Sequence, residues 1–156
     1  MSALGWLIGI VLPACAKSGA AGVPPAPDLS RLKRPSRRNN ALAAPASNSP
    51  APDLVTPLYP VAAEKLRAIL NDVARLQPRT APLEKSGAQL SWVQRSAVLN
   101  FPDRITARAE PAGAGSSTLI LYSQSLYGRY DFGVNHRRLG IWLSAIENSL
   151  QQPAGK

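Results

Sequence analysis

Apolar residues recur every three or four positions in two parts of the chain, as they do on the buried side of an amphipathic helix. The first part runs from Pro60 to Pro78, and the second begins at about Asn135. The two stripes are formed by Ala62, Leu66, Ile69, Leu70 and Val73, and by Leu139, Trp142, Leu143, Ile146 and Leu150. The pattern therefore predicts two helices that each bury one face.

Between these helices the periodicity predicts three strands. Residues 104–110 alternate strictly, with Ile105, Ala107 and Ala109 on one face, which indicates a half-buried strand. Residues 90–101 slip in phase, which indicates a bulge, and residues 118–126 begin apolar on both faces. The predicted fold class is α+β, in the order α-β-β-β-α: a three-stranded antiparallel meander packed by helices.

Composition divides the chain into four segments. Residues 1–16 are an apolar signal or anchor segment, and residues 17–57 are rich in proline and alanine. Residues 58–150 hold every predicted helix and strand, and residues 151–156 form a short tail that we expect to be disordered. Proline/alanine chains are extended and semi-rigid, so residues 17–57 are predicted to be a linker that holds the domain away from its anchor.

The apolar segment ends in Leu12-Pro13-Ala14-Cys15, which resembles a bacterial lipobox. Cys15 is the only cysteine, so an internal disulfide is excluded and lipid attachment is its predicted role. We expect a membrane-anchored protein with its domain on the periplasmic side. The alternatives are an uncleaved anchor, for which the basic residues 31–38 place the domain in the cytoplasm, and an ordinary soluble terminus.

The formal net charge is +9, and about half of this excess lies outside residues 58–150. The densest basic cluster, residues 31–38, contains no aromatic residue, so the charge does not predict nucleic-acid binding. Two interpretations of the cluster stay open. It is either a solvated part of the linker or a segment attracted to anionic lipid headgroups.

Residue types that carry catalysis or bind metals are scarce. His136 is the only histidine, and no paired-cysteine motif is present, so neither a metal nor a cofactor is expected. Ser123 and Ser125 lack the glycine-flanked turn of an activated nucleophile. We therefore expect no catalytic residue. A hydrolase would need His136 within hydrogen-bonding reach of one of these serines.

The start of the second helix has an unusual charge pattern. Asn135 is predicted to be the N-cap, and Arg137 and Arg138 follow in the first turn, where positive charge opposes the helix dipole. Asp131 is expected to fold back and pair with Arg138 or Arg137. In the alternative interpretation, the two arginines and the helix N–H groups form an anion pocket.

Residues 123–139, together with Phe101-Pro102-Asp103, resemble the signature of DUF1499, a domain of unknown function in bacterial envelope proteins and plastids. The matching positions are Ser123, Ser125, Gly128, Asp131, Phe132, Gly133, Asn135 and Arg138. Gln124 and Leu126 stand where the family usually has arginines. The resemblance implies an envelope protein, and it implies no particular activity.

We expect a non-catalytic, membrane-tethered domain that binds a protein partner or serves as an accessory subunit. Aromatic residues around an arginine on a loop are typical of a recognition surface. The candidate binding residues are Tyr127, Arg129, Tyr130, Asp131, Phe132, Asn135, Arg137 and Arg138. The alternative is a carrier of a lipid-like or anionic ligand, with a cavity lined by Trp92, Tyr122, Leu126 and Trp142.

Overall fold

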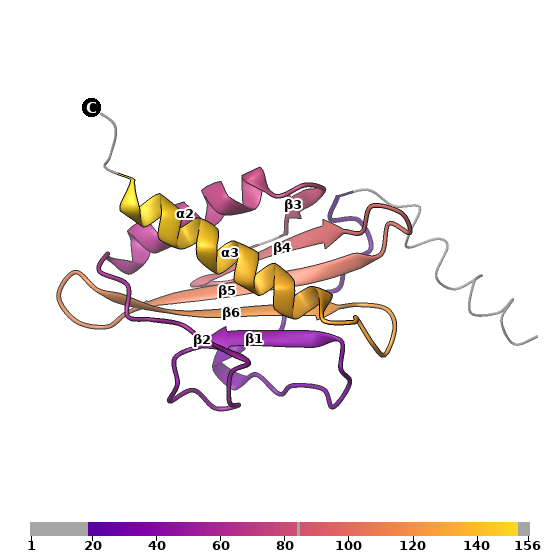
Figure 1. Ribbon diagram of the computed structural model, residues 1–156, viewed down its shortest axis with the longest axis horizontal. Coiled ribbons are helices and arrows are strands. Elements are labelled where there is room, and N and C mark those ends of the chain that lie inside the picture. Colours follow the sequence, from indigo (N-terminus) through magenta and orange to yellow (C-terminus); the bar gives the residue numbers. More distant parts are fainter. Residues whose placement is uncertain (1–18, 84, 153–156) are drawn as a thin grey trace, which may run out of the picture.

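The computed structural model describes residues 19–83 and 85–152. Helices α2 (Ala63–Leu76) and α3 (Val134–Gln151) lie on one face of a six-stranded sheet (Figure 1). The sheet has the order β2-β1-β6-β5-β4-β3. The remaining elements are the 3-10 turn η1 (Leu29–Arg31) and strands β1 (Asn40–Ala44), β2 (Leu54–Val55), β3 (Thr80–Pro82), β4 (Gln89–Arg95), β5 (Pro102–Pro111) and β6 (Ser117–Ser125).

The predicted α+β class, both predicted helices and the antiparallel meander β4-β5-β6 are confirmed. The predicted strand count is wrong, because β1, β2 and β3 extend the sheet from three strands to six. The sheet is also mixed, since β1 and β2 pair in parallel. Strands of two or three residues, such as β2 and β3, are too short to produce an alternation that a sequence pattern can reveal.

Residues 17–57 were predicted to form a linker, and this is wrong for the part that contains β1 and β2. Strand β1 lies inside the sheet, between β2 and β6, and Ala41 to Ala44 are buried. Ala41 and Ala43 belong to the same core as Leu139 of α3, which packs against this strand. The alanine content of this segment was the reason for predicting a linker. In the structure, the small alanine side chains of β1 allow α3 to pack closely against the sheet.

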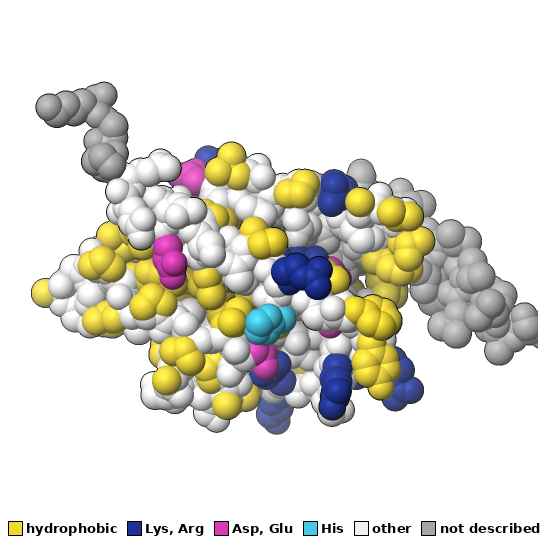
Figure 2. Space-filling model, viewed as in Figure 1, with side chains coloured by type: hydrophobic (Ala, Val, Ile, Leu, Met, Phe, Trp, Pro, Cys, Tyr) yellow, Lys and Arg dark blue, Asp and Glu magenta, His cyan; other side chains and the backbone are white. Residues whose placement is uncertain are grey.

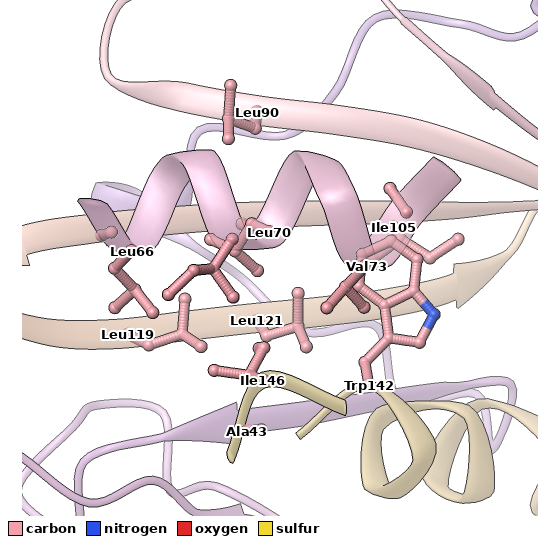
Figure 3. Close-up of a cluster of buried hydrophobic side chains, with 14 of the residues drawn as sticks. Ala43, Leu66, Leu70, Val73, Leu90, Ile105, Leu119, Leu121, Trp142 and Ile146 are labelled. Atoms are coloured by element: carbon pink, nitrogen blue, oxygen red, sulfur yellow. The ribbon is translucent and has the colours of Figure 1, made fainter. Parts of the chain in front are cut away.

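The main core lies between the two helices and the sheet (Figure 3). Leu66, Leu70 and Val73 of α2 meet Leu119 and Leu121 of β6 in this layer. The indole rings of Trp92 and Trp142 pack edge to face, with centroids 5.2 Å apart and planes at 61°. Both predicted helix stripes therefore point into this core, except that Ala62 is the exposed N-cap of α2 and Ala63 is buried instead.

The opposite face of the sheet, called the back face here, is covered by residues 19–32 (Figure 1). Arg104 donates to the carbonyl oxygens of Pro24 and Pro25, and burial lowers the pKa of its guanidinium. The prediction of a half-buried β5 is therefore corrected, because Arg104 and Thr106 on its back face are buried as well.

Within residues 19–83 and 85–152, no helix is both long and apolar enough to cross a bilayer. The predicted apolar segment 1–16 and the lipid-attachment candidate Cys15 lie outside the described residues. Of the predicted tail, Gln151 is the last residue of α3 and residues 153–156 are not described.

Candidate functional site

The candidate site lies at the end of the sheet where β6 stops and α3 begins (Figure 1). Residues 126–133 form the β6–α3 loop, and the β4–β5 loop, residues 96–101, lies beside it. The rings of Phe101 and Tyr127 link the two loops, with centroids 6.4 Å apart. On the other side, Tyr130 forms a β-bridge with Arg38, just before β1.

Helix α3 is capped by Asp131, and the prediction that Asn135 is the N-cap is wrong. The N-cap residue is Gly133, and Asn135 lies inside the first turn. The Asp131 carboxylate accepts from the backbone N–H of Gly133 at 3.0 Å and from that of Asn135 at 2.9 Å. A carboxylate at a helix N-terminus also complements the dipole that Arg137 and Arg138 oppose.

Replacing Asp131 with alanine is expected to lower the free energy of unfolding by about 1 kcal/mol, the usual loss for a helix cap. Urea denaturation followed by circular dichroism measures the change. Asp72→Ala is the control, because among the described residues Asp72 pairs only with Arg75, on the exposed surface of α2. A loss at Asp131 no larger than that at Asp72 would argue against the capping role.

The expected pairing of Asp131 with Arg138 or Arg137 is not found among the described residues. Arg138 pairs instead with Asp103 at the start of β5. Its Nη2 lies 2.6 Å from the Asp103 Oδ2, and both side chains are only 10% exposed. Its Nε donates to Gln94 of β4 at 2.5 Å. Arg138 therefore joins α3 to two strands of the sheet at once.

Asn135 connects this ion pair to the end of β6. Its Oδ1 accepts from the Ser123 hydroxyl at 2.5 Å and from Arg138 Nη1 at 2.8 Å. Its Nδ2 donates to the Ser125 hydroxyl at 2.9 Å and to the carbonyl oxygen of Asn39 at 3.1 Å. We refer to one group of side chains as the polar cluster: Gln94, Asp103, Ser123, Ser125, Asn135 and Arg138.

Strand register brings the polar cluster together. Gln94, Asp103 and Ser125 are directly opposite one another on three neighbouring strands. Asn39, just before β1, closes the row, because its carbonyl oxygen accepts from the backbone N–H of Ser125 at 2.9 Å. One turn of α3 then lies over this row and bonds to it.

Within the polar cluster, most of the groups that could bind an anion or act as a nucleophile already have partners inside the protein. The Arg138 guanidinium is neutralised by Asp103, and the backbone N–H groups of Gly133, Val134 and Asn135 at the start of α3 are bonded to Asp131. Ser123 is fully buried, and both serine hydroxyls are bonded to Asn135. His136 is exposed on α3, and within the described part of the chain no hydrogen bond joins it to either serine.

The other predicted binding residues face solvent. Arg129 and Arg137 are exposed, and Tyr130 and Phe132 are among the most exposed large side chains. Phe132 is 91% exposed, and its φ of 52° lies in the left-handed region that non-glycine residues rarely adopt. The structure thus divides the predicted set into an exposed part and a structural part. The structural part is Asp131, Asn135 and Arg138, with Tyr127 half-buried between the two parts.

Two residues of this network were not predicted. Gln94 lies on the helix-facing side of β4, as Trp92 does, and it bonds to Arg138. Its spacing of two residues from Trp92 was the only signal in the sequence that its side chain points toward the helices. Asn39 donates from its side chain to the carbonyl oxygens of Ser125 and Gly128, at 3.2 and 2.8 Å. It lay in the segment taken for a linker, where nothing in the sequence marked it.

Comparison with known proteins agrees with these boundaries. Residues 29–146 match the family described as "Protein of unknown function (DUF1499)". No curated protein and no solved structure matches the chain. The matched range begins at η1, includes β1 and the whole polar cluster, and ends within α3. Because it covers well over half of the 156 residues, the chain belongs to the DUF1499 family.

Proposed function

We propose that this protein is a non-catalytic, membrane-tethered binding domain of the bacterial envelope, which recognises a protein partner through its β6–α3 loop. The observation that carries the proposal is Phe132, which is 91% exposed on a left-handed backbone. Such a residue adds strain to the fold and buries almost nothing in it. Binding a partner would account for both features.

The loop around Phe132 is held firmly in place. Asp131 bonds to the start of α3, and its backbone N–H donates to the carbonyl oxygen of Arg38 at 3.2 Å. The Asn39 side chain fixes Gly128 from the other side. A preorganised loop with exposed aromatic and arginine side chains has the chemistry of an interface hot spot, because little entropy is lost on binding.

The interior supports a binding domain over the alternative ligand carrier. A carrier cavity was expected between Trp92, Tyr122, Leu126 and Trp142. The two tryptophans instead pack against each other in the main core, whereas Tyr122 belongs to the cluster on the back face. The hydrolase alternative is disfavoured by the buried Ser123 and the exposed His136.

The membrane tether in this proposal is based on the sequence. Residues 1–16 are apolar, and Cys15 has the setting of an acylated cysteine. We propose the periplasmic side for the domain, with an uncleaved anchor and a cytoplasmic domain as the alternative. Either arrangement would let the protein serve as an accessory subunit of a membrane complex.

Replacing Phe132 with glycine provides a sharp test. Glycine removes the aromatic anchor and also relieves the left-handed φ, at the cost of a more flexible unfolded chain. The variant is expected to weaken partner binding by about 2 kcal/mol or more. Its stability should stay within about 1 kcal/mol of the unmodified protein. Affinity purification from native membranes and urea denaturation measure the two quantities.

Ile141→Ala is the matched control, since Ile141 is an exposed apolar residue of α3 outside the loop. It should leave the co-purified proteins unchanged, as should His136→Ala. If a protein captured by the unmodified chain remained fully bound to Phe132→Gly and to Arg129→Ala with Tyr130→Ala, the loop would not be the binding site. Loss of function from His136→Ala alone would favour an enzyme.

A further inference from the structure

The β4–β5 loop exposes apolar side chains at its tip. Val98 is 91% exposed, and Leu99 next to it is exposed as well. Single exposed apolar residues are common on protein surfaces, but here they gather at one end of the domain. Five of the nine exposed large hydrophobic residues in the described part of the chain lie in the two loops or at the start of α3: Val98, Leu99, Tyr130, Phe132 and Val134.

Basic side chains surround this apolar end. Arg37, Arg38, Arg129 and Arg137 are exposed, and none of them forms an ion pair with a described residue. The carboxylates of Asp103 and Asp131 in the same region are already bonded to Arg138 and to the start of α3. Figure 2 shows hydrophobic and basic side chains next to each other at the end of the molecule where the loops lie. Uncompensated positive charge beside apolar side chains matches the surface of an anionic bilayer.

The chain also enters the domain at this end. Arg95 is the last residue of β4, and it donates to the carbonyl oxygens of Gly19 at 3.1 Å and Ala21 at 3.0 Å. Only residues 17 and 18 separate the apolar segment 1–16 from Gly19. At 3.8 Å per residue, these steps reach at most about 11 Å. An apolar segment in a membrane would therefore keep the β4–β5 loop close to that membrane.

We infer that the β4–β5 loop lies in the surface of an anionic bilayer. Val98 and Leu99 enter the boundary between headgroups and acyl chains, and the four arginines lie among the headgroup phosphates. The inference shares the membrane tether with the proposed function, but it needs no protein partner. It assigns insertion into the bilayer to the β4–β5 loop, whereas the β6–α3 loop carries Phe132 and contributes only Arg129 to the headgroup contact.

A fluorescent label at the loop tip tests this directly in the full chain. With Cys15 retained, Val98→Cys provides a site for an environment-sensitive dye, and Leu58→Cys provides the matched control; the unmodified chain, treated with the same dye, gives the contribution of Cys15. Leu58 is 61% exposed and precedes Tyr59, which bridges to Ser117 at the opposite end of β6. The proteins are reconstituted into phosphatidylcholine vesicles with and without phosphatidylglycerol. A second set of the same vesicles contains lipids with brominated acyl chains, which quench a dye that enters the bilayer.

In anionic vesicles the label at residue 98 is expected to shift to the blue and to be quenched by the brominated chains. The label at residue 58 should report water. Replacing Arg37 and Arg38 with glutamine is expected to lower the ratio of docked to undocked loop by about fivefold per arginine. Omitting phosphatidylglycerol should also lower the ratio of docked to undocked loop, because it removes the negative charge of the bilayer.

The inference would be overturned by a label at residue 98 that stays in water, or by equal quenching at residues 98 and 58. A label at residue 98 that responds only to native membranes, and not to lipid vesicles, would also overturn it and assign the loop to a protein. Phe132→Gly separates this inference from the proposed function. That variant should lose the partner and keep the quenching at residue 98.

Discussion

Replacing Arg138 with alanine is expected to destabilise the domain by about 3–5 kcal/mol, the loss typical of a broken buried ion pair. The Asp103 side chain is only 10% exposed in the folded domain, and the substitution removes the cation that pairs with its carboxylate. It also removes the hydrogen bonds that Arg138 donates to Gln94, Ser123 and Asn135. Urea denaturation followed by circular dichroism measures the change, which would be a large part of the stability of a small domain.

Arg137→Ala is the control for this prediction, because Arg137 is its exposed neighbour and forms no ion pair with a described residue. Its effect should stay within about 0.5 kcal/mol. Asp103→Asn with Arg138→Gln removes both charges and should cost less than the sum of the two single changes. Strict additivity would show that the pair is not coupled.

The second large effect is expected from truncation. A fragment that begins at residue 58 retains every element predicted from the sequence pattern, yet it lacks β1, β2 and the segment on the back face. It loses the burial of Leu29 and Leu42, worth about 1.5–3 kcal/mol each. It also leaves the hydrogen-bonding edge of β6 without a partner. We expect this fragment to show no cooperative thermal transition and to aggregate on size-exclusion chromatography.

A fragment that begins at residue 19 is the matched comparison, since it keeps the carbonyl oxygens of Gly19 and Ala21, which bond to Arg95, and those of Pro24 and Pro25, which bond to Arg104. It should melt cooperatively and elute as a compact species. Cooperative melting of the shorter fragment would contradict the role assigned to β1.

The elements that could be predicted are those whose own residues form a strong pattern. Leu66, Leu70 and Val73 identify α2, and the alternation around Ile105 identifies β5. Strand β1 could not be found in this way, because alanine has little strand propensity of its own. It becomes a strand because its small side chains fit beneath α3, which is a property of the packed structure.

The location of the site could be predicted from the sequence, but most of its hydrogen bonds and its ion pair could not. Asp131, Asn135 and Arg138 were all singled out, but the roles of cap and buried connector were exchanged between Asp131 and Asn135. That exchange depends on the left-handed backbone of Phe132 and Gly133, which moves the helix start by two residues. The partners of Arg138 depend on strand register, which the sequence alone does not specify.

The polar cluster joins parts of the chain that are far apart in sequence. Asn39 and Asn135 are separated by 96 residues, and Gln94 and Arg138 by 44. Loops of this length must close before such contacts can form, and non-local contacts of this kind are associated with slow folding. The polar cluster therefore holds together segments that meet only when β1, β4, β5 and β6 have assembled into one sheet.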